Sequence, residues 1–366
     1  MPISYIRDHK IMTNRERFVK LMRYEKIDAL PVFALEPTER YTISNWRGQG
    51  LPENKLPEDF LGMGKEMKLP VFFYPFPRFE KKKLFEDDTY IVEVSPMGST
   101  VKRRKDFPAM YYGYIDYPVK SVSDWHEYKK RFTAGDHRYG DDLDDMADEA
   151  AQSENPVSIM LYPFFMRLGL YALGLDYFLT AFYEEPELIH EMFDYWSVFT
   201  VETLEPVLKK IKPDVVTLME DLAFKTGPHI SPAIYKEFWI PYQNRVVSLL
   251  KKYGVENICL HSAGDFRVLL PIMIDNGIDM IWPLDRNSGM DPVELRKQYG
   301  QVLRMAGGIG KFTLLSGKTA IDKELERLTP LIKEGGFFPA PDDIVPPETP
   351  FENYAYLIEK CKELRL

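Results

Sequence analysis

Short apolar runs and longer amphipathic stretches follow one another regularly through the second half of the chain. Each apolar run stops abruptly at polar residues, which is typical of a buried parallel strand, whereas the amphipathic stretches repeat apolar positions at helical spacing. This alternation predicts strands that are each followed by a covering helix. The predicted strands of this half are Val157–Tyr162, Val215–Met219, Asn257–Leu260, Met280–Trp282, Val302–Ala306 and Phe337–Ala340.

Residues that begin and end helices support these boundaries. Ser231-Pro232 opens the amphipathic stretch from Ala233 to Lys252, and Gly254 follows its end. Proline in the first turn and glycine past the last turn are the expected signals at the two ends of a helix. Near the amino terminus, Thr13 and Glu16 have the spacing of a capping box, which predicts that a helix starts there.

The first half of the chain is less regular. Asp28–Leu35 and Pro70–Phe76 are predicted as two further strands, and Thr89–Lys105 alternates like a hairpin. Eight strands alternating with helices predict an α/β fold, a (β/α)8 TIM barrel. We expect a single barrel domain over residues 1–366, with insertions in residues 36–156. An open doubly wound sheet is the alternative, but no strand leads into a GxGxxG turn.

Candidate chemistry gathers at the predicted strand ends, because active sites of such barrels lie at the carboxyl ends of the strands. His261 follows the strand Asn257–Leu260, and Glu220 and Asp221 follow Val215–Met219. Side chains alternate in direction along a strand, so only one of this acidic pair should face the barrel axis, and we expect Glu220. The further candidates at strand ends and the mouth are Arg40, Tyr41, Tyr162, Arg167, Asp285 and Asp343.

Composition excludes several classes of function. The formal net charge is −9 and no basic face is visible, which disfavours nucleic-acid binding. No stretch is long and apolar enough to span a membrane, and no signal peptide is visible, so a cytoplasmic protein is expected. The two cysteines, Cys259 and Cys361, do not form a disulfide framework.

Several segments together resemble the uroporphyrinogen decarboxylase superfamily over nearly the whole chain. They cover the amino-terminal helix and first strand, a middle segment, the loop after the acidic strand end, and the closing strand and helix. These segments are Met12–Phe18, Glu25–Val32, Tyr117–Trp125, Lys225–Pro232, Gly335–Asp343 and Pro347–Asn353. The resemblance implies a TIM barrel and one of two activities, decarboxylation or cobamide-linked methyl transfer.

The segment after the first strand favours methyl transfer. True decarboxylases of this superfamily carry Arg-Gln-Ala-Gly-Arg-Tyr there, whose arginines hold substrate carboxylates. This chain has Glu36-Pro-Thr-Glu-Arg40-Tyr41, so a glutamate stands at the place of the first arginine. An acidic strand end in an acidic protein is a poor match for a polycarboxylated tetrapyrrole. We therefore predict no uroporphyrinogen decarboxylation.

The resemblance also implies a metal and a protein partner. Thiol-methylating members hold zinc with His-x-Cys and a later Cys, whereas this chain has His261-Ser262-Ala263 and Asp343 at those places. Other members use Glu and His ligands, so His261, Glu220 and Asp343 form the expected zinc set, with Glu237 as an outside option. A corrinoid-binding Asp-x-His-x-x-Gly motif is missing, so the corrinoid is expected from a partner protein.

The expected reaction is methyl transfer between a small methylated substrate, of the methyl ether or methylamine type, and a corrinoid protein. His261, Glu220 and Asp221 are the expected catalytic residues, and Arg40, Tyr41, Tyr162, Arg167 and Asp285 are expected to bind substrate. Two alternatives stay open: a decarboxylase of a carboxylated aromatic or pyrrolic compound, and a barrel without catalysis that binds a corrinoid or tetrapyrrole. The resemblance also leaves a homodimer open.

Overall fold

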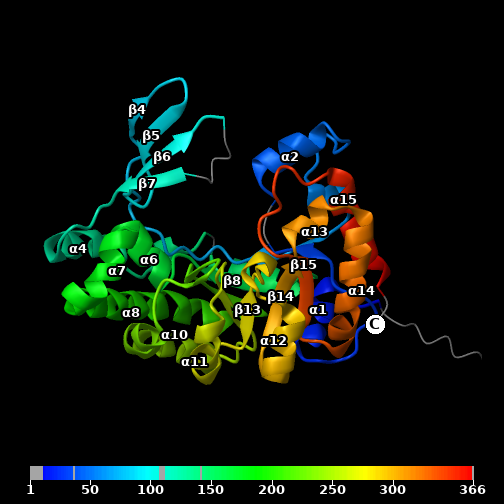
Figure 1. Ribbon diagram of the computed structural model, residues 1–366. Coiled ribbons are helices and arrows are strands. Elements are labelled where there is room, and N and C mark those ends of the chain that lie inside the picture. Colours follow the sequence, from blue (N-terminus) through cyan, green and yellow to red (C-terminus); the bar gives the residue numbers. More distant parts are fainter. Residues whose placement is uncertain (1–10, 36–37, 107–111, 141, 365–366) are drawn as a thin grey trace, which may run out of the picture.

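Parallel strands, surrounded by helices, form the centre of the molecule (Figure 1). The computed structural model describes residues 11–35, 38–106, 112–140 and 142–364. The strands that build the barrel are β1 (Phe33–Ala34), β2 (Gly64–Lys65), β3 (Met67–Lys68), β8 (Val157–Leu161), β9 (Val215–Met219), β12 (Ile258–His261), β13 (Met280–Trp282), β14 (Arg304–Ile309) and β15 (Phe337–Pro341).

The strands are joined in chain order, as in a TIM barrel. Seven of them form one sheet in the order β15-β14-β13-β12-β9-β8-β3, and β1 pairs in parallel with β2. Glu66 alone separates β2 from β3. Phe33 of β1 stacks on Phe338 of β15 with ring centroids 4.6 Å apart, so the two ends of the strand array meet. Phe18 of the amino-terminal helix packs edge-on against Phe33 at 5.6 Å and against Phe338 at 6.3 Å, so it covers the junction of these two strands. The predicted (β/α)8 fold is confirmed.

Helices cover the outer face of the strands, as the amphipathic stretches predict, and further helices lie in the insertions. The helices are α1 (Asn14–Met22), α2 (Arg40–Arg47), α3 (Pro57–Phe60), α4 (Val122–Tyr128), α5 (Leu143–Gln152), α6 (Phe165–Ala172), α7 (Leu175–Glu184), α8 (Pro186–Lys210), α9 (Pro232–Ile234), α10 (Ile240–Lys252), α11 (Leu270–Asp275), α12 (Pro292–Tyr299), α13 (Lys311–Leu315), α14 (Lys318–Glu334) and α15 (Phe351–Glu363). The capping box of Thr13 and Glu16 is present at the start of α1. No helix in the described part of the chain could cross a membrane.

The insertions of the first half project from one end of the barrel. They include a four-stranded antiparallel sheet of β4 (Lys83–Glu86), β5 (Tyr90–Val94), β6 (Thr100–Arg104) and β7 (Tyr112–Asp116). The expected hairpin is the β5–β6 pair of this sheet. Figure 1 shows the sheet standing above α6 and α7, with α2 on the opposite side beside α15. Both insertions follow the first strands of the barrel, so they flank the end where strands finish.

The second predicted strand is wrong. The barrel strand at this place is the β2–β3 segment from Gly64 to Lys68, and Pro70–Phe76 is an irregular segment with one isolated bridge, Val71 to Tyr139. Proline has no backbone N–H, so Pro70 and Pro75 weaken any strand there. The true strand carries Glu66 and Lys68 and therefore lacks the apolar signal of its neighbours.

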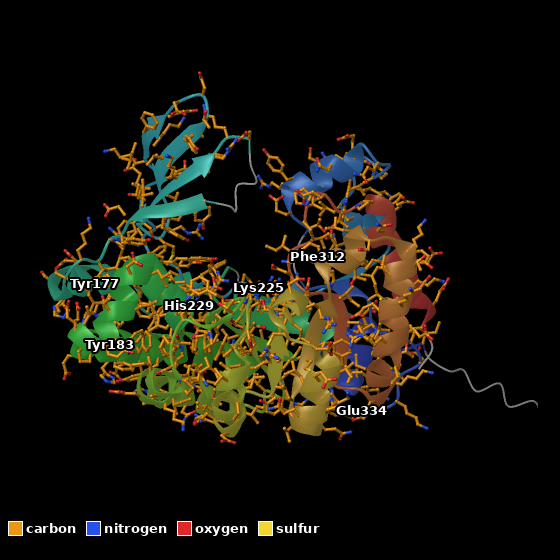
Figure 2. All side chains as sticks on the ribbon, viewed as in Figure 1. Tyr177, Tyr183, Lys225, His229, Phe312 and Glu334 are labelled. Atoms are coloured by element: carbon orange, nitrogen blue, oxygen red, sulfur yellow. The ribbon has the colours of Figure 1, made fainter. Side chains whose placement is uncertain are left out.

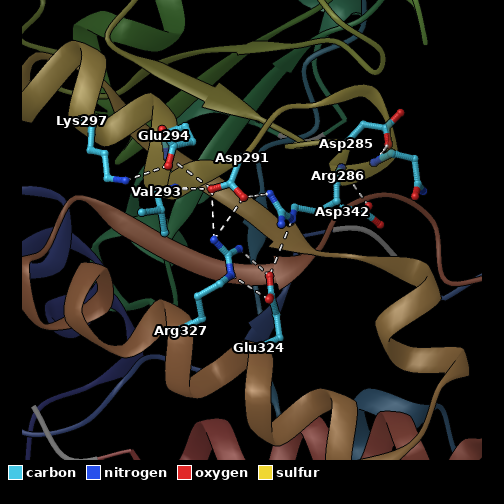
Figure 3. Close-up of polar contacts among 10 residues, drawn as sticks. Asp285, Arg286, Asp291, Val293, Glu294, Lys297, Glu324, Arg327 and Asp342 are labelled. Carbon is cyan, nitrogen blue, oxygen red and sulfur yellow. Dashed lines mark hydrogen bonds and ion pairs between the residues drawn. The ribbon is translucent and has the colours of Figure 1, made fainter.

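An ion-pair network fixes the loops that follow the last strands (Figure 3). Asp291 caps α12 by accepting from Val293 N at 2.8 Å, and it pairs with Arg286 and with Arg327 of α14. Buried Asp342 accepts from Arg286 N at 3.1 Å and from Lys311 N at 2.9 Å. One carboxylate thereby ties the ends of β13, β14 and β15 together.

Arg138 holds the insertion loop against the barrel helices. Its side chain is fully buried and donates to the carbonyl oxygens of Thr133 and Arg131, each at 2.8 Å, and to that of Tyr74. The guanidinium also lies over the Phe199 ring, 4.8 Å from its centroid. Burial lowers the pKa of Arg138 to about 10. This one side chain therefore fixes the position of Tyr74 at the mouth.

Replacing this guanidinium should destabilise the fold strongly. Arg138→Met leaves three backbone carbonyl groups without their guanidinium donor and removes a fully buried side chain, so we expect the free energy of unfolding to fall by about 3 kcal/mol or more in urea titration. Arg47→Met is the control, because Arg47 pairs with a Glu53 side chain that is 81% exposed. That change should cost less than about 0.5 kcal/mol. Equal losses in both variants would contradict the assigned role of Arg138.

Candidate active site

The ends of three neighbouring strands bring the central residues of the site together. Met219 of β9 pairs with His261 of β12, which in turn pairs with Trp282 of β13. These residues lie at the last paired positions of their strands, so they form the top layer of the barrel. The Trp282 ring meets the His261 imidazole edge to face at 4.6 Å. His261 is therefore at the carboxyl-end mouth, as its position in the sequence predicts.

The imidazole of His261 is held in its neutral form. Burial, together with the positive charges of Arg167 and Lys68, lowers its pKa to about 3. Nδ1 lies 3.5 Å from the carbonyl oxygen of Glu220, which can only accept. The proton of a neutral ring therefore belongs on Nδ1, which leaves the lone pair on Nε2. The group serves as a hydrogen-bond acceptor at physiological pH.

Glu220 faces away from the barrel axis, which contradicts the expected inward direction. One carboxylate oxygen accepts from Met166 N at 2.6 Å, and the other accepts from Trp239 Nε1 at 2.8 Å. The side chain is fully buried between the start of α6 and the π-helical turn Tyr235–Trp239. Burial raises the pKa of Glu220 to about 8. Its role is to tie β9 to two helices, not to contact substrate.

The neighbouring acid, Asp221, takes the position that was expected for Glu220. Its carboxylate lies 3.8 Å from Arg167 Nη2. Arg167 also donates through Nε to the Glu220 carbonyl at 3.2 Å, so Arg167 and His261 converge on the same backbone oxygen. Through Nη1, Arg167 donates to the Tyr171 hydroxyl at 3.2 Å. The expected residues Arg167, Asp221 and His261 are thus brought together.

Tyr162 completes a chain of hydroxyl groups next to Arg167. Its hydroxyl is hydrogen-bonded to that of Tyr171, and its ring lies under the Arg167 guanidinium at 5.3 Å. Tyr74 packs against Tyr162 at 5.8 Å, and Tyr114 of β7 packs against Tyr171 at 5.6 Å. Burial raises the pKa of Tyr74, Tyr114 and Tyr171. Tyr114 of the inserted sheet thus joins Tyr74, Tyr162 and Tyr171 in an aromatic wall, and the hydroxyls of Tyr74, Tyr114 and Tyr171 stay protonated.

Glu66 and Lys68 are site residues that the sequence did not reveal. Glu66 lines a small cavity in the barrel interior together with Cys259 and Trp282. Lys68 Nζ donates to the Leu35 carbonyl at 3.1 Å and lies 3.5 Å from the Glu66 carboxylate. Burial raises the pKa of Glu66, although the charge of Lys68 opposes the shift. Their spacing of two residues was the available signal, because it places both on one face of a strand.

The expected zinc set does not assemble. Glu220 is turned towards α6, and Asp343 pairs with Lys311 Nζ at 3.0 Å and accepts from Ile344 N at 2.8 Å. Glu237 is exposed on the outer helix layer. Among the residues that the structure describes, no group of three or more His, Cys, Asp or Glu side chains could hold a metal ion. The expected ligand set therefore does not fit zinc in this arrangement, because a place at a strand end fixes the height of a residue along the barrel but not the direction of its side chain.

The remaining expected site residues lie apart from this centre. Asp285 caps its own loop by accepting from Asn287 N at 3.0 Å and from Ser288 Oγ at 2.6 Å. Arg40 and Tyr41 are exposed at the start of α2, on the far wall. Glu36 lies outside the described residues. Figure 2 shows Lys225 and His229 on loops and Phe312 on α13. Cys259 and Cys361 are both free and buried.

The raised pKa of Glu220 predicts a pH-dependent stability. Between its ordinary pKa near 4.5 and the folded value of about 8, the folded protein binds more protons than the unfolded chain. The stability contributed by Glu220 is therefore lost as the pH rises through this window. Relative to Glu220→Gln, the wild-type free energy of unfolding should fall from pH 5 to pH 8 by at most about 1.4 kcal/mol per pH unit. Glu237→Gln should follow the wild type, and a flat difference for Glu220→Gln would oppose this assignment.

Elemental analysis tests the ligand geometry. Because the expected set is dispersed, protein purified without added metal should contain well under one equivalent of zinc. His261→Ala should leave that content unchanged. Zinc near one equivalent that disappears in His261→Ala would show that the side chains rearrange into a metal site.

Comparison with solved structures supports the same architecture. A methyltransferase from Methanosarcina mazei superposes with a TM-score of 0.62 at 16% identity, covering 96% of this chain and 99% of that one. Likeness at this identity shows the fold and not the activity.

Sequence comparison gives the family. Residues 155–364 match the model for uroporphyrinogen decarboxylase (URO-D). The chain is 26% identical over 186 residues to the uroporphyrinogen decarboxylase of Prochlorococcus marinus (strain AS9601), covering 50% of each protein. It is 28% identical over 175 residues to that of Myxococcus xanthus (strain DK1622), covering 46% of each. The chain thus spans about half the length of the curated relatives it matches. The chain belongs to the uroporphyrinogen decarboxylase (URO-D) family.

Proposed function

We propose that this protein transfers a methyl group between a small methylated substrate and a corrinoid carried by a separate protein. The observation that carries the proposal is the hydrogen-bonded chain from Arg167 through Tyr171 to Tyr162 at the barrel mouth. The family and the shared fold with a methyltransferase are compatible with it. The chemistry of the site supplies the argument.

Removing a methyl group from oxygen or nitrogen is hard because the heteroatom leaves with negative charge or as a free amine. A proton donor or a cation at that atom lowers the barrier. Arginine only donates, so the Tyr171 oxygen accepts from Arg167, and the Tyr171 proton then goes to Tyr162. The Tyr162 hydroxyl is thus left as the terminal donor of a polarised chain. The Tyr162 hydroxyl would thus stabilise the leaving heteroatom, which is the role a metal ion has in other sites.

Neutral His261 complements this donor. An imidazole that accepts through Nε2 can orient the substrate without adding a third positive charge beside Arg167 and Lys68. Trp282 packs against the ring and excludes water from one side. The corrinoid, when a partner protein presents it, supplies the nucleophile or the methyl group for the exchange. The residues of this chain bind the small molecule, orient it and move the proton.

The donor role of Tyr162 gives a direct test. With free cob(I)alamin as methyl acceptor and a panel of methyl ethers and methylamines, the wild type should form methylcobalamin, followed by its absorption spectrum. Tyr162→Phe removes only the hydroxyl and should lower kcat/KM by roughly 100-fold. Tyr183→Phe is the matched control, because this tyrosine of α7 is 75% exposed and points away from the mouth (Figure 2).

Three outcomes would contradict all or part of this account. Methylcobalamin formation that is equal in wild type and Tyr162→Phe would remove the hydroxyl chain from the mechanism. No methylcobalamin from any donor in the panel, with carbon dioxide released from carboxylated compounds, would favour decarboxylation. That second candidate is supported by the family and by Arg167, which shares the Glu220 carbonyl with His261 and whose charge suits a carboxylate. Binding without turnover of either kind would identify a non-catalytic barrel.

A further inference from the structure

The inserted sheet has a free edge at its first strand, β4. The strands of this sheet lie in the order β4-β5-β6-β7, and among the residues that the structure describes β4 pairs only with β5. β7 faces the barrel, because Tyr114 packs against Tyr171 of α6, so β4 is at the opposite edge of the sheet (Figure 1). An edge strand offers free N–H and C=O groups with which another strand can pair. The β4 edge is therefore a candidate interaction surface.

The sequence around β4 is complementary in charge to itself. Residues 81–88 read Lys-Lys-Lys-Leu-Phe-Glu-Asp-Asp, and all of them are exposed. If two copies run antiparallel with a two-fold axis between Leu84 and Phe85, every lysine of this segment faces an acidic residue of the other copy. Lys83, for example, faces Glu86. Parallel copies in register would place lysine against lysine, so the charge pattern selects the antiparallel arrangement.

The free backbone groups of β4 require the same register. The Lys82 carbonyl oxygen accepts from β5 at 2.9 Å, and Asp87 N donates to β5 at 3.1 Å. The C=O and N–H groups of a trans peptide point in opposite directions, so the Lys83 N–H and the Glu86 carbonyl face away from β5. In the antiparallel arrangement each Lys83 N–H meets the Glu86 carbonyl of the other copy. Main-chain hydrogen bonds and charge pairs therefore agree.

A bulge in β4 is compatible with this pairing. The register to β5 shifts between Lys83 and Phe85, so Leu84 is an extra residue in the strand. Bulges commonly protect edge strands, because they disturb the row of free backbone groups. A second copy carries the same bulge at the matching place, and the spacing from Lys83 to Glu86 is equal in both chains. The bulge thus disfavours pairing with a regular strand but not pairing with an identical one.

We propose that two copies of this chain associate through β4, with the strands antiparallel and Lys83 of each copy opposite Glu86 of the other. Leu84 and Phe85, which are 50% and 53% exposed, then pack across the two-fold axis. Within one chain Lys83 contacts Glu86 at the surface, where such a pair contributes little, so exchanging partners costs little. A short strand buries a small area, so the dimer is weak and reversible.

Sedimentation velocity over an about hundredfold range of protein concentration tests this dimer. The wild type should pass from monomer to dimer. Lys83→Glu and Glu86→Lys should each weaken dimerisation about tenfold or more, because like charges then face each other at two places. Lys102→Glu is the matched control, because Lys102 is exposed on β6, which lies between β5 and β7 and has no free edge. Its dimer dissociation constant should stay within about twofold of the wild-type value.

A mixture of the two single variants separates charge complementarity from loss of folding. A Lys83→Glu chain is acidic at both places and a Glu86→Lys chain is basic at both, so one copy of each restores the opposite charges. The equimolar mixture should dimerise at least as readily as the wild type, although each variant alone stays monomeric. A wild type that is monomeric throughout, equal dimerisation of the wild type and both variants, or a mixture without heterodimer would overturn the proposal. None of these outcomes depends on methyl transfer.

Discussion

The buried carboxylate of Glu220 is the contact on which the rest of the site depends. It bonds to the first turn of α6 and to Trp239 of the π-helical turn, and so fixes both against the end of β9. With α6 fixed, the guanidinium of Arg167 reaches back to the Glu220 carbonyl, where the His261 ring also lies. A buried acid costs free energy unless its partners are well placed. The partners of Glu220 offset this cost and hold α6 in place. A fixed α6 in turn sets the direction of the Arg167 side chain.

The electrostatic character of the mouth follows from this arrangement. Glu220 adds no carboxylate at the barrel axis because its side chain is turned away, and Asp221 lies 3.8 Å from Arg167. The imidazole of His261 is neutral, mainly because it is buried. Next to Arg167, Tyr171 keeps its hydroxyl proton because burial raises its pKa. Such a site stabilises negative charge on a bound molecule, through fixed donors and without a metal.

Much of the fold was predictable from sequence because most barrel strands are buried on both faces and therefore appear as apolar runs. The runs ending at Tyr162, Met219 and Leu260 predicted the heights of Tyr162, Asp221 and His261 in the barrel. The second strand escaped prediction because its inward positions, Glu66 and Lys68, are charged. A strand that carries charged site residues lacks the apolar run by which strands are recognised in a sequence.

The direction of side chains at strand ends was the second limit. Glu220 and Asp221 are adjacent, and the sequence does not say which one faces the axis. The answer depends on a tertiary contact, the Glu220 bonds to Met166 and Trp239, which come from segments far apart along the chain. The expected zinc ligands do not converge for the same reason. Asp343 forms an ion pair with Lys311 at the start of α13. Three side chains converge on one point only when they share a height along the barrel axis and also point in suitable directions.

The central claim is that His261 stays neutral because it is buried, with the positive charges of Arg167 and Lys68 adding to the effect. Nitrogen-15 NMR of histidine-labelled protein, with His261→Gln to assign the signal, measures this directly. The account predicts that the His261 ring nitrogens keep the neutral pattern, with the proton on Nδ1, from pH 8 down to at least pH 5. A titration of this ring with a midpoint near the ordinary histidine value of about 6.5 would contradict it.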